Sequence, residues 1–339
     1  MKRIDLRSDT VTQPTEAMLE AMMKAVVGDD VIDVDPTTRA LEDQLAKDFG
    51  FDRALFCPSG TMANQIALML HTRPGDEIIC DALSHIYWYE GGGPAANAGV
   101  SLRLLPGERG CLTADLVASA MNPENEHAAR TALISLENTA NKAGGTCYEL
   151  EEIKAIRALA NKCELPVHLD GARLFNALVA KSQKPQQYKG LFDTMSICLS
   201  KGLGCPVGSV LLVNHAQYYE ARRIRKRLGG GMRQSGFLAA AGLYALNNHI
   251  DRLAEDHQRA EALANILSEC DWVKQVVKPQ TNIVIFYPHK DADNIIKLLN
   301  EAGVDIISMG GGALRMVTHM HITNEDIDVC RRIFSKLAV

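Results

Sequence analysis

The chain has 339 residues, and its 47% hydrophobic and 23% charged residues are typical of a globular protein with a sizeable core. The formal net charge of -5 gives no basic excess, which argues against a nucleic-acid partner. No apolar run approaches the roughly 20 residues of a membrane helix, and the N-terminus lacks the apolar centre of a secretory signal. We therefore expect a cytoplasmic protein with no membrane partner.

The nine cysteines are an odd number and form no C-x-x-C pair. Cys57, Cys80 and Cys198 lie in apolar, strand-like runs, where a thiol packs as a small hydrophobic group. This pattern favours reduced thiols over a disulfide framework. It also predicts no metal site, because the spacing of metal ligands is absent.

The first two thirds of the chain alternate between strand and helix patterns. After an extended arm to about residue 14, helical periodicity covers 15–26 and 37–49. Seven strand-like runs follow at 53–57, 77–80, 101–105, 131–136, 166–169, 194–199 and 207–213, with helices at 61–70, 149–162 and 173–181. This predicts an α/β fold with a seven-stranded, mostly parallel sheet and helices on both faces. Because only residues 202–206 join the last two strands, one of them should run antiparallel.

The remaining third has a different pattern. Helices are predicted at 215–227 and 234–268. Strands at 272–277, 282–287, 304–307 and 314–318 then mix with helices at 292–302 and 323–337. We therefore expect a large domain at 1–250, which includes the N-terminal arm 1–14, and a small C-terminal α+β domain at 251–339.

Ligands of an open α/β sheet bind beyond the carboxyl ends of its strands, and the run at 53–57 delivers Ser59-Gly60-Thr61 there. Backbone N–H groups at the start of a helix suit a phosphate, and the two hydroxyls add donors. The alternative is an ordinary N-cap with a turn glycine.

Two further strands deliver an acid and an amine. Asp170 follows the run at 166–169, and a buried carboxylate needs a cation such as a protonated pyridine nitrogen. The alternative is an N-cap aspartate paired with Arg173. Lys201 follows the run at 194–199 between small residues, where desolvation makes an amine nucleophilic enough to form a Schiff base. The alternative is a surface turn lysine.

These three features are stronger together than alone. Asp170 and Lys201 are 31 residues apart in the sequence, the length of one strand–helix–strand unit, which places both on one edge of the sheet. A phosphate cradle, an acid and a lysine are the contacts that pyridoxal 5'-phosphate requires. The sequence therefore predicts a pyridoxal-phosphate enzyme acting on a small amino acid.

The same residues carry a resemblance that covers nearly the whole chain. It includes DLRSDTVT at 5–12, VGDDV at 27–31, DPT at 35–37, SGTMANQ at 59–65, the 85–90 segment, LENT at 136–139, HLDGAR at 168–173, residues 199–206, LGGGMRQ at 228–234 and RMVTH at 315–319. The chain resembles the low-specificity L-threonine aldolases, a family of fold-type I pyridoxal-phosphate enzymes.

The resemblance implies roles for individual residues. Lys201 would hold the cofactor, with Asp170 on its ring nitrogen and His85 stacked on its face. Ser59, Gly60 and Thr61 would bind its phosphate. Ser8, Arg173 and Arg315 would bind the substrate carboxylate, with Arg173 also near the cofactor. Lys226 and Arg233 match family positions close to a neighbouring subunit's site, which implies an oligomer, typically a homotetramer.

Some positions depart from the family pattern. Ile32-Asp33 replace an aromatic residue and a glycine, and Ala140 replaces a histidine. These departures leave the substrate preference open. His127 matches, across a variable loop, a histidine near the substrate hydroxyl. His85 and His127 are therefore both candidates for the general base, which needs a pKa near neutral.

The expected reaction is retro-aldol cleavage of L-threonine or L-allo-threonine to glycine and acetaldehyde. One alternative keeps the cofactor but acts on phenylserine, serine or a β-elimination substrate. A second alternative is a non-catalytic protein that kept the scaffold, and Lys201, Asp170, His85 and Arg315 argue against it.

Overall fold

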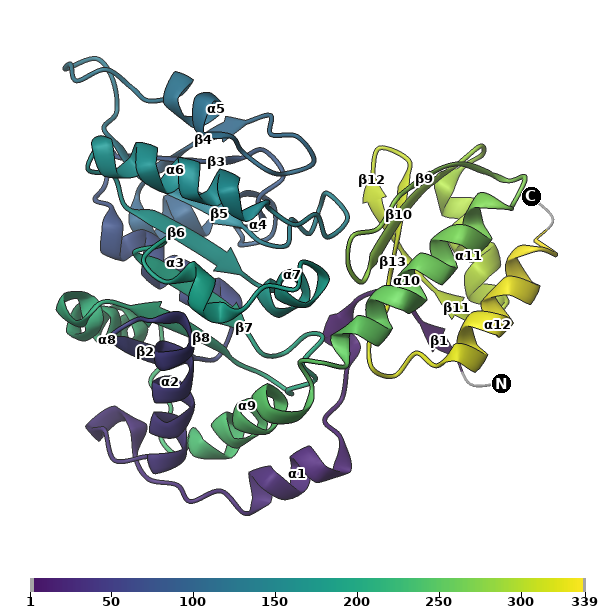
Figure 1. The fold of residues 1–339 in the computed structure, drawn as a ribbon, viewed down its shortest axis with the longest axis horizontal. Coiled ribbons are helices and arrows are strands. Elements are labelled where there is room, and N and C mark those ends of the chain that lie inside the picture. The colour runs from purple at the N-terminus through teal and green to yellow at the C-terminus, as the bar shows by residue number, and fades with distance from the viewer. Residues whose placement is uncertain (1–2, 338–339) are drawn as a thin grey trace.

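The computed structural model describes residues 3–337 and has a large and a small domain (Figure 1). The large domain is built on a sheet of order β2-β8-β7-β6-β5-β3-β4. Its strands are β2 (Arg53–Cys57), β3 (Glu77–Asp81), β4 (Ser101–Leu105), β5 (Thr131–Glu137), β6 (Val167–Gly171), β7 (Thr194–Cys198) and β8 (Ser209–Val213). Only β8 runs antiparallel to its neighbours in this sheet. The predicted mostly parallel sheet of seven strands is confirmed, including one antiparallel strand after the short link.

Helices cover both faces of this sheet because its strands are apolar on both sides. Leu55 and Leu211 pack on one face under α3 (Gly60–His71) and α8 (Tyr218–Arg227). Phe56 and Leu212, the next residues of the same strands, pack in the main core on the other face. The helices of that core are α2 (Pro36–Phe49), α5 (Ala114–Ser119), α6 (Leu150–Lys162), α7 (Leu174–Ala180) and α9 (Gly236–Asn248). The short helices α1 (Glu16–Met23) and α4 (His85–Trp88) complete the large domain.

The small domain is a four-stranded antiparallel sheet of order β12-β13-β10-β9 with helices packed against it. Its elements are α10 (Leu253–Ser268), β9 (Val273–Val277), β10 (Ile283–Pro288), α11 (Ala292–Glu301), β11 (Val304–Asp305), β12 (Ile307–Gly310), β13 (Ala313–Val317) and α12 (Asn324–Phe334). The single helix predicted at 234–268 is wrong, because the chain breaks between α9 and α10. His249 Nδ1 lies 2.8 Å from Leu203 O at this break, where the chain passes from one domain to the other.

The N-terminal arm joins the two domains. Its strand β1 (Ile4–Asp5) pairs in parallel with β11, and Ile4 and Leu6 are buried in the core of the small domain. The arm was expected with the large domain, but these apolar side chains place residues 4–6 in the small one. Further along, Thr12 Oγ1 donates a hydrogen bond of 2.9 Å to Lys201 O of the large domain.

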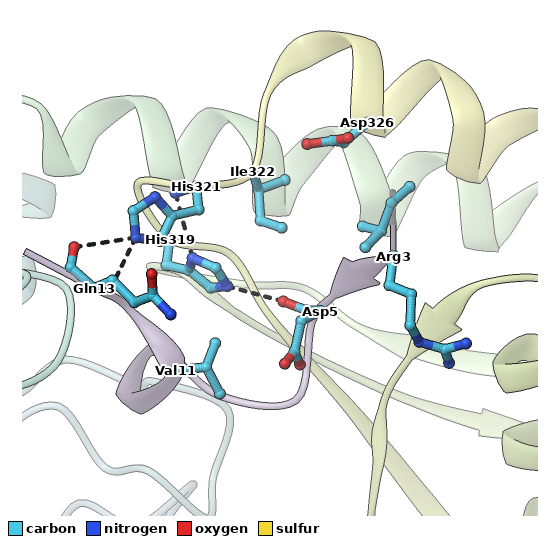
Figure 2. A pocket seen from close by; sticks show the side chains of 9 residues that line it. Arg3, Asp5, Val11, Gln13, His319, His321, Ile322 and Asp326 are labelled. Carbon is cyan, nitrogen blue, oxygen red and sulfur yellow. Dashed lines mark hydrogen bonds between the residues drawn. The ribbon is translucent and has the colours of Figure 1, made fainter. Parts of the chain in front are cut away.

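Two histidines of the small domain hold the arm in place (Figure 2). His319 Nε2 lies 2.8 Å from Asp5 O, and His321 Nε2 lies 2.9 Å from Gln13 N. Between them and the arm is a cavity of about 150 Å³. Among the helices of residues 3–337, none is both long and apolar enough to cross a bilayer.

Candidate active site

Strand pairing brings the predicted site segments to one edge of the large sheet. Asp170 of β6 pairs with Ser196 of β7, and Lys201 follows β7 directly. Cys57 at the end of β2 and Cys198 at the end of β7 both pair with Ser209 of β8. Since adjacent strands are about 4.8 Å apart, the end of β2 lies roughly 10 Å from the end of β7. Residues 59–61, Asp170 and Lys201 therefore meet at the carboxyl edge, as the spacing predicts.

A cavity of about 260 Å³ opens at this edge, and three parts of the chain form its wall. The large domain contributes Lys201, His85, Tyr89, Asn141 and Arg173; the arm contributes Ser8 and Thr10; the small domain contributes residues 307–309 and Arg315. Lys201 is thus a cavity residue and not a lysine on a surface turn. Because all three parts contribute, the cavity is complete only when the arm and the small domain are packed in place.

Asp170 is buried and accepts hydrogen bonds only from neutral donors. Its Oδ2 accepts from Asn64 Nδ2 at 2.8 Å, and its Oδ1 accepts from the backbone N–H of Ala172 at 3.0 Å. The alternative in which Arg173 pairs with this carboxylate is wrong, because Arg173 binds Asp9 instead. A buried carboxylate without a cationic partner in its own chain suits a protonated ring nitrogen.

His85 is fixed on two sides by buried acids. Glu137 Oε2 accepts a hydrogen bond of 2.7 Å from the backbone N–H of His85, and Glu90 Oε1 lies 2.9 Å from its Nδ1. Burial lowers the pKa of His85, but the bond to Glu90 and the charges of Asp170, Glu90 and Glu137 raise it overall. Burial and the neighbouring Asp170 raise the pKa of Glu137 to about 7. His85 therefore faces the cavity with its basicity enhanced.

The turn after β2 can receive a phosphate. Ser59 is the N-cap of α3, and its Oγ accepts a hydrogen bond of 3.2 Å from Met62 N. The N-cap alternative for this turn is therefore also correct. A side chain added at Gly60 would meet no atom within 4 Å, so the space above this helix start is open to a ligand. The helix dipole and the amide groups of the first turn favour an anion there.

Arg173 and Arg315 lie side by side but differ in their partners. Arg173 binds both oxygens of the buried Asp9, with Nε–Oδ2 at 2.7 Å and Nη2–Oδ1 at 2.6 Å. Burial would raise the pKa of Asp9, but the positive charges of Arg173 and Lys201 hold it well below its usual range. Asn141 Oδ1 accepts from Nη1 of Arg173 at 3.1 Å and from Nη1 of Arg315 at 3.0 Å.

Arg315 has no carboxylate partner in the described part of the chain. Besides Asn141, it donates to the backbone carbonyl of Arg7 at 3.0 Å, and its buried Nε has no partner. Burial, and then the charge of Arg173, lower the pKa of Arg315 to about 10. A buried guanidinium with unused N–H groups facing a cavity is suited to binding a carboxylate ligand.

Several predicted site residues lie outside this cavity. His127 is 87% exposed and precedes β5, at the amino edge of the sheet, so one chain does not bring it to its own site. Lys226 is exposed on α8, and Arg233 pairs with Asp29 at 2.7 Å. The roles predicted for these residues concern a neighbouring subunit or the substrate hydroxyl, and they stay predictions.

The departures from the family pattern also lie away from the cavity wall. Ile32 is 67% exposed, and Asp33 forms ion pairs with Arg39 and Arg222. Ala140 is buried, and its Cβ would be 2.7 Å from a Cβ added at Gly110. The substitution at 140 therefore alters packing below the site and leaves the lining of the cavity unchanged.

The sequence reasoning missed four residues that organise the site. Asp9, Asn64 and Glu90 each lie inside a motif that was singled out for a neighbouring residue, and Asn141 follows such a motif directly. Buried polar residues within these motifs were the available signal. The sequence could not show which partner each of them binds.

The donor set as a whole fits pyridoxal 5'-phosphate. Lys201 offers an amine in the cavity, Asp170 a carboxylate without a cation, His85 a flat ring and residues 59–61 an open helix start. No metal ion is needed to explain the cluster of His85, Glu90 and Asp170, whose polar atoms lie within 4.8 Å of one another. N–H groups of Asn64 and His85 already occupy the positions between these carboxylates.

Comparison with known proteins agrees with this geometry. The family model described as Beta-eliminating lyase matches residues 5–291. The low specificity L-threonine aldolase of Escherichia coli K12 is 42% identical over 325 residues, which are 96% of each chain. Low-specificity L-threonine aldolase 1 of Arabidopsis thaliana is 39% identical, covering 96% of this chain and 94% of that protein.

Solved structures show the same fold. The threonine aldolase of Leishmania major has a TM-score of 0.82 at 23% identity, covering 98% of this chain and 97% of the other. The serine palmitoyltransferase of Sphingomonas wittichii has a TM-score of 0.73 at 18% identity, covering 98% and 86%. From its full-length similarity at about 40% identity, this chain belongs to the beta-eliminating lyase family and, within it, to the low-specificity L-threonine aldolases.

Proposed function

We propose that this protein is a pyridoxal-phosphate-dependent aldehyde-lyase that cleaves L-threonine and L-allo-threonine to glycine and acetaldehyde. The observation that carries the proposal is the composition of one cavity. It holds the amine of Lys201 and the buried, unpaired guanidinium of Arg315, and the cation-free carboxylate of Asp170 lies on the adjoining strand. The names of the relatives support the choice of threonine as substrate.

The residues divide the work of the reaction among them. When bound, pyridoxal phosphate supplies an aldehyde that condenses with amines and a ring that accepts electrons. Asp170 holds a proton on the ring nitrogen, and residues 59–61 bind the phosphate. Arg315 and Ser8 hold the carboxylate of the amino acid, and Arg173 contributes the N–H groups that Asp9 and Asn141 leave unused. His85 takes the proton of the β-hydroxyl group.

A paired assay tests this proposal. Purified protein with added cofactor is incubated with L-threonine or L-allo-threonine, and glycine and acetaldehyde are both measured. Equal amounts of the two products from at least one isomer are expected. The substrate proposal fails if neither isomer yields glycine.

A second candidate keeps the same site and changes the substrate to phenylserine, serine or a β-elimination substrate. The matching family model, Beta-eliminating lyase, favours keeping it. A panel of β-substituted amino acids separates the two candidates. Pyruvate formed from serine would indicate β-elimination, whereas glycine together with an aldehyde indicates retro-aldol cleavage.

We also propose that the protein works as a homotetramer in the cytoplasm. Apolar side chains gather on α1 and the loop after it: Leu19, Met23, Val26, Ile32 and Val34 are 47% to 79% exposed. Exposed apolar side chains in this number favour burial against another copy of the chain. Light scattering after gel filtration measures the oligomeric state, and a monomer would refute this part of the proposal. Cell fractionation tests the location.

A further inference from the structure

The proposed mechanism leaves Glu90 without a role, although Glu90 is the most enclosed acid at the site. Its side chain is 0% exposed, and it lies just beyond α4, which begins with His85. Its Oε1 accepts from His85 Nδ1 at 2.9 Å and from Asn64 Nδ2 at 2.8 Å, while its Oε2 accepts from Gln65 Nε2 at 2.6 Å. In the part of the chain that the structure describes, no lysine or arginine pairs with this carboxylate. A buried carboxylate without such a partner acts most strongly on the nearest titratable group.

Asn64 joins Glu90 to Asp170. Its Nδ2 donates to Glu90 Oε1 and to Asp170 Oδ2, each at 2.8 Å, so one amide nitrogen lies between the two carboxylates. Its Oδ1 accepts from Ser196 Oγ at 2.7 Å and lies 3.2 Å from His168 Nε2. Burial lowers the pKa of His168 to about 4, so this imidazole is neutral and donates through Nε2. All four contacts therefore fix the amide of Asn64 in one orientation.

The bond to Glu90 also decides where His85 carries its proton. A carboxylate accepts hydrogen bonds, so the proton lies on Nδ1, and Nε2 keeps its lone pair. The imidazole is 25% exposed and lines the same cavity as Lys201. Asp170 and Glu137 face His85 from β6 and β5, the Tyr89 ring lies 5.5 Å away, and the cations Lys201, Arg173 and Arg315 line the same cavity.

We propose that Glu90 is a positioning residue that holds His85 as the Nδ1–H tautomer with a basic Nε2, and that Asn64 couples this pair to Asp170. The inference rests on the proposed aldol cleavage and assigns the general base to His85. As the hydroxyl O–H bond breaks, an Nε2–H bond forms. The O–H electron pair becomes the second bond of the aldehyde carbonyl, and the Cα–Cβ pair stays with Cα. Cα gains one proton to give glycine and His85 releases one, so the reaction is balanced.

The main test measures the pKa of His85 without measuring activity. Full-length protein freed of cofactor is treated with diethyl pyrocarbonate, which attacks only neutral imidazole, and each modified histidine is quantified by peptide mass spectrometry across pH 5 to 8. In Glu90→Gln, we expect the apparent pKa of His85 to fall by about 1 unit or more, because an opposite charge within ~4–6 Å shifts a pKa by 1–3 units. Glutamine keeps the shape of the side chain and an acceptor for Nδ1.

Matched controls separate this effect from packing. Glu301→Gln removes one charge from an exposed position on α11, and His215 lies on the opposite edge of the sheet, after the end of β8. Neither this variant nor the His215 profile should show the shift. Glu90→Asp keeps the charge and should give a smaller shift than Glu90→Gln. The inference fails if Glu90→Gln leaves the His85 profile in place, or if Glu90→Asp shifts it equally.

A second measurement separates failure of this inference from failure of the proposed function. In the holoenzyme, the acidic limb of the pH profile of kcat for L-threonine should move to lower pH in Glu90→Gln, with a loss of kcat larger than any change in KM. If no isomer of threonine is cleaved but the His85 shift is observed, the pairing stands and the function is wrong. If threonine is cleaved and neither profile moves, the function stands and the role of Glu90 is refuted.

Discussion

The two walls of the cavity are built on opposite principles. On the wall from the large domain, the charged groups are held by partners from the same chain: Asp9 by Arg173, and His85 by Glu90. On the wall from the small domain, Arg315 is buried with only neutral partners and an unused Nε. The first wall is prepared in advance for a resident cofactor, whereas the second is completed by the carboxylate of each substrate molecule.

The largest effect should come from the prepared wall itself. In Lys201→Ala, the absorption band of the protein-bound cofactor should disappear and turnover should fall below detection, because no other lysine lines the cavity. Absorption spectra and the glycine assay measure both. Lys274→Ala, at an exposed position on β9, should leave both unchanged. A band that persists in Lys201→Ala would place the cofactor on another amine.

Asp170→Asn should have the next largest effect. Asparagine fills the same space but removes the charge that holds the ring nitrogen protonated, so kcat should fall by about 10²-fold or more, as when one preorganised electrostatic group is removed from an active site. The measurement is kcat at saturating cofactor and substrate. If kcat stays within a few-fold of the wild-type value, Asp170 does not face the ring nitrogen.

Arg173→Met tests the paired arginine through stability. It leaves Asp9 buried without its cation, and breaking a buried pair in this way costs about 3–5 kcal/mol of the free energy of unfolding. Because the pKa of Asp9 is lowered by folding, the pair stabilises fully above the unfolded value of about 3.9 and is lost as pH falls toward the folded one. Urea denaturation at pH 7 and at pH 3 should therefore show a smaller difference between the variant and wild type at pH 3.

Arg315→Met should have the opposite sign on stability. It removes a buried cation that has no carboxylate partner, so the melting temperature should stay equal or rise slightly. At the same time kcat/KM should fall by about 30-fold, which corresponds to roughly 2 kcal/mol of lost carboxylate binding. Arg332→Met, exposed on α12, is the control. A loss of stability like that of Arg173→Met would refute the contrast between the two walls.

The sequence predicted those parts of the fold that depend on local pattern. The strands at 53–57 and 194–199 are short apolar runs, and the alternation with helices implied their parallel order. The break at His249 was missed because it depends on a contact with Leu203 O, 46 residues earlier in the chain. The arm was assigned to the wrong domain for a similar reason, since Ile4 and Leu6 find their apolar neighbours about 300 residues further along the chain.

The site was predictable where one residue carries one role, as Lys201 and Asp170 do. It was not predictable where a role depends on orientation. The amide of Asn64 faces two acids only because Ser196 and His168 hold its other end. The position of His127 could have been questioned from the sequence, since it precedes the strand at 131–136 and a parallel strand presents its carboxyl end to the ligand.

The pairing of β1 with β11 also has a consequence for biosynthesis. Residue 4 pairs with residue 304, so the first strand to leave the ribosome has no partner until almost the whole chain has been made. At about 5–20 residues per second, the interval is roughly 15–60 seconds. Because the arm carries Ser8 and Asp9 into the cavity, a nascent or prematurely terminated chain has no competent catalytic centre, and activity begins only with a finished polypeptide.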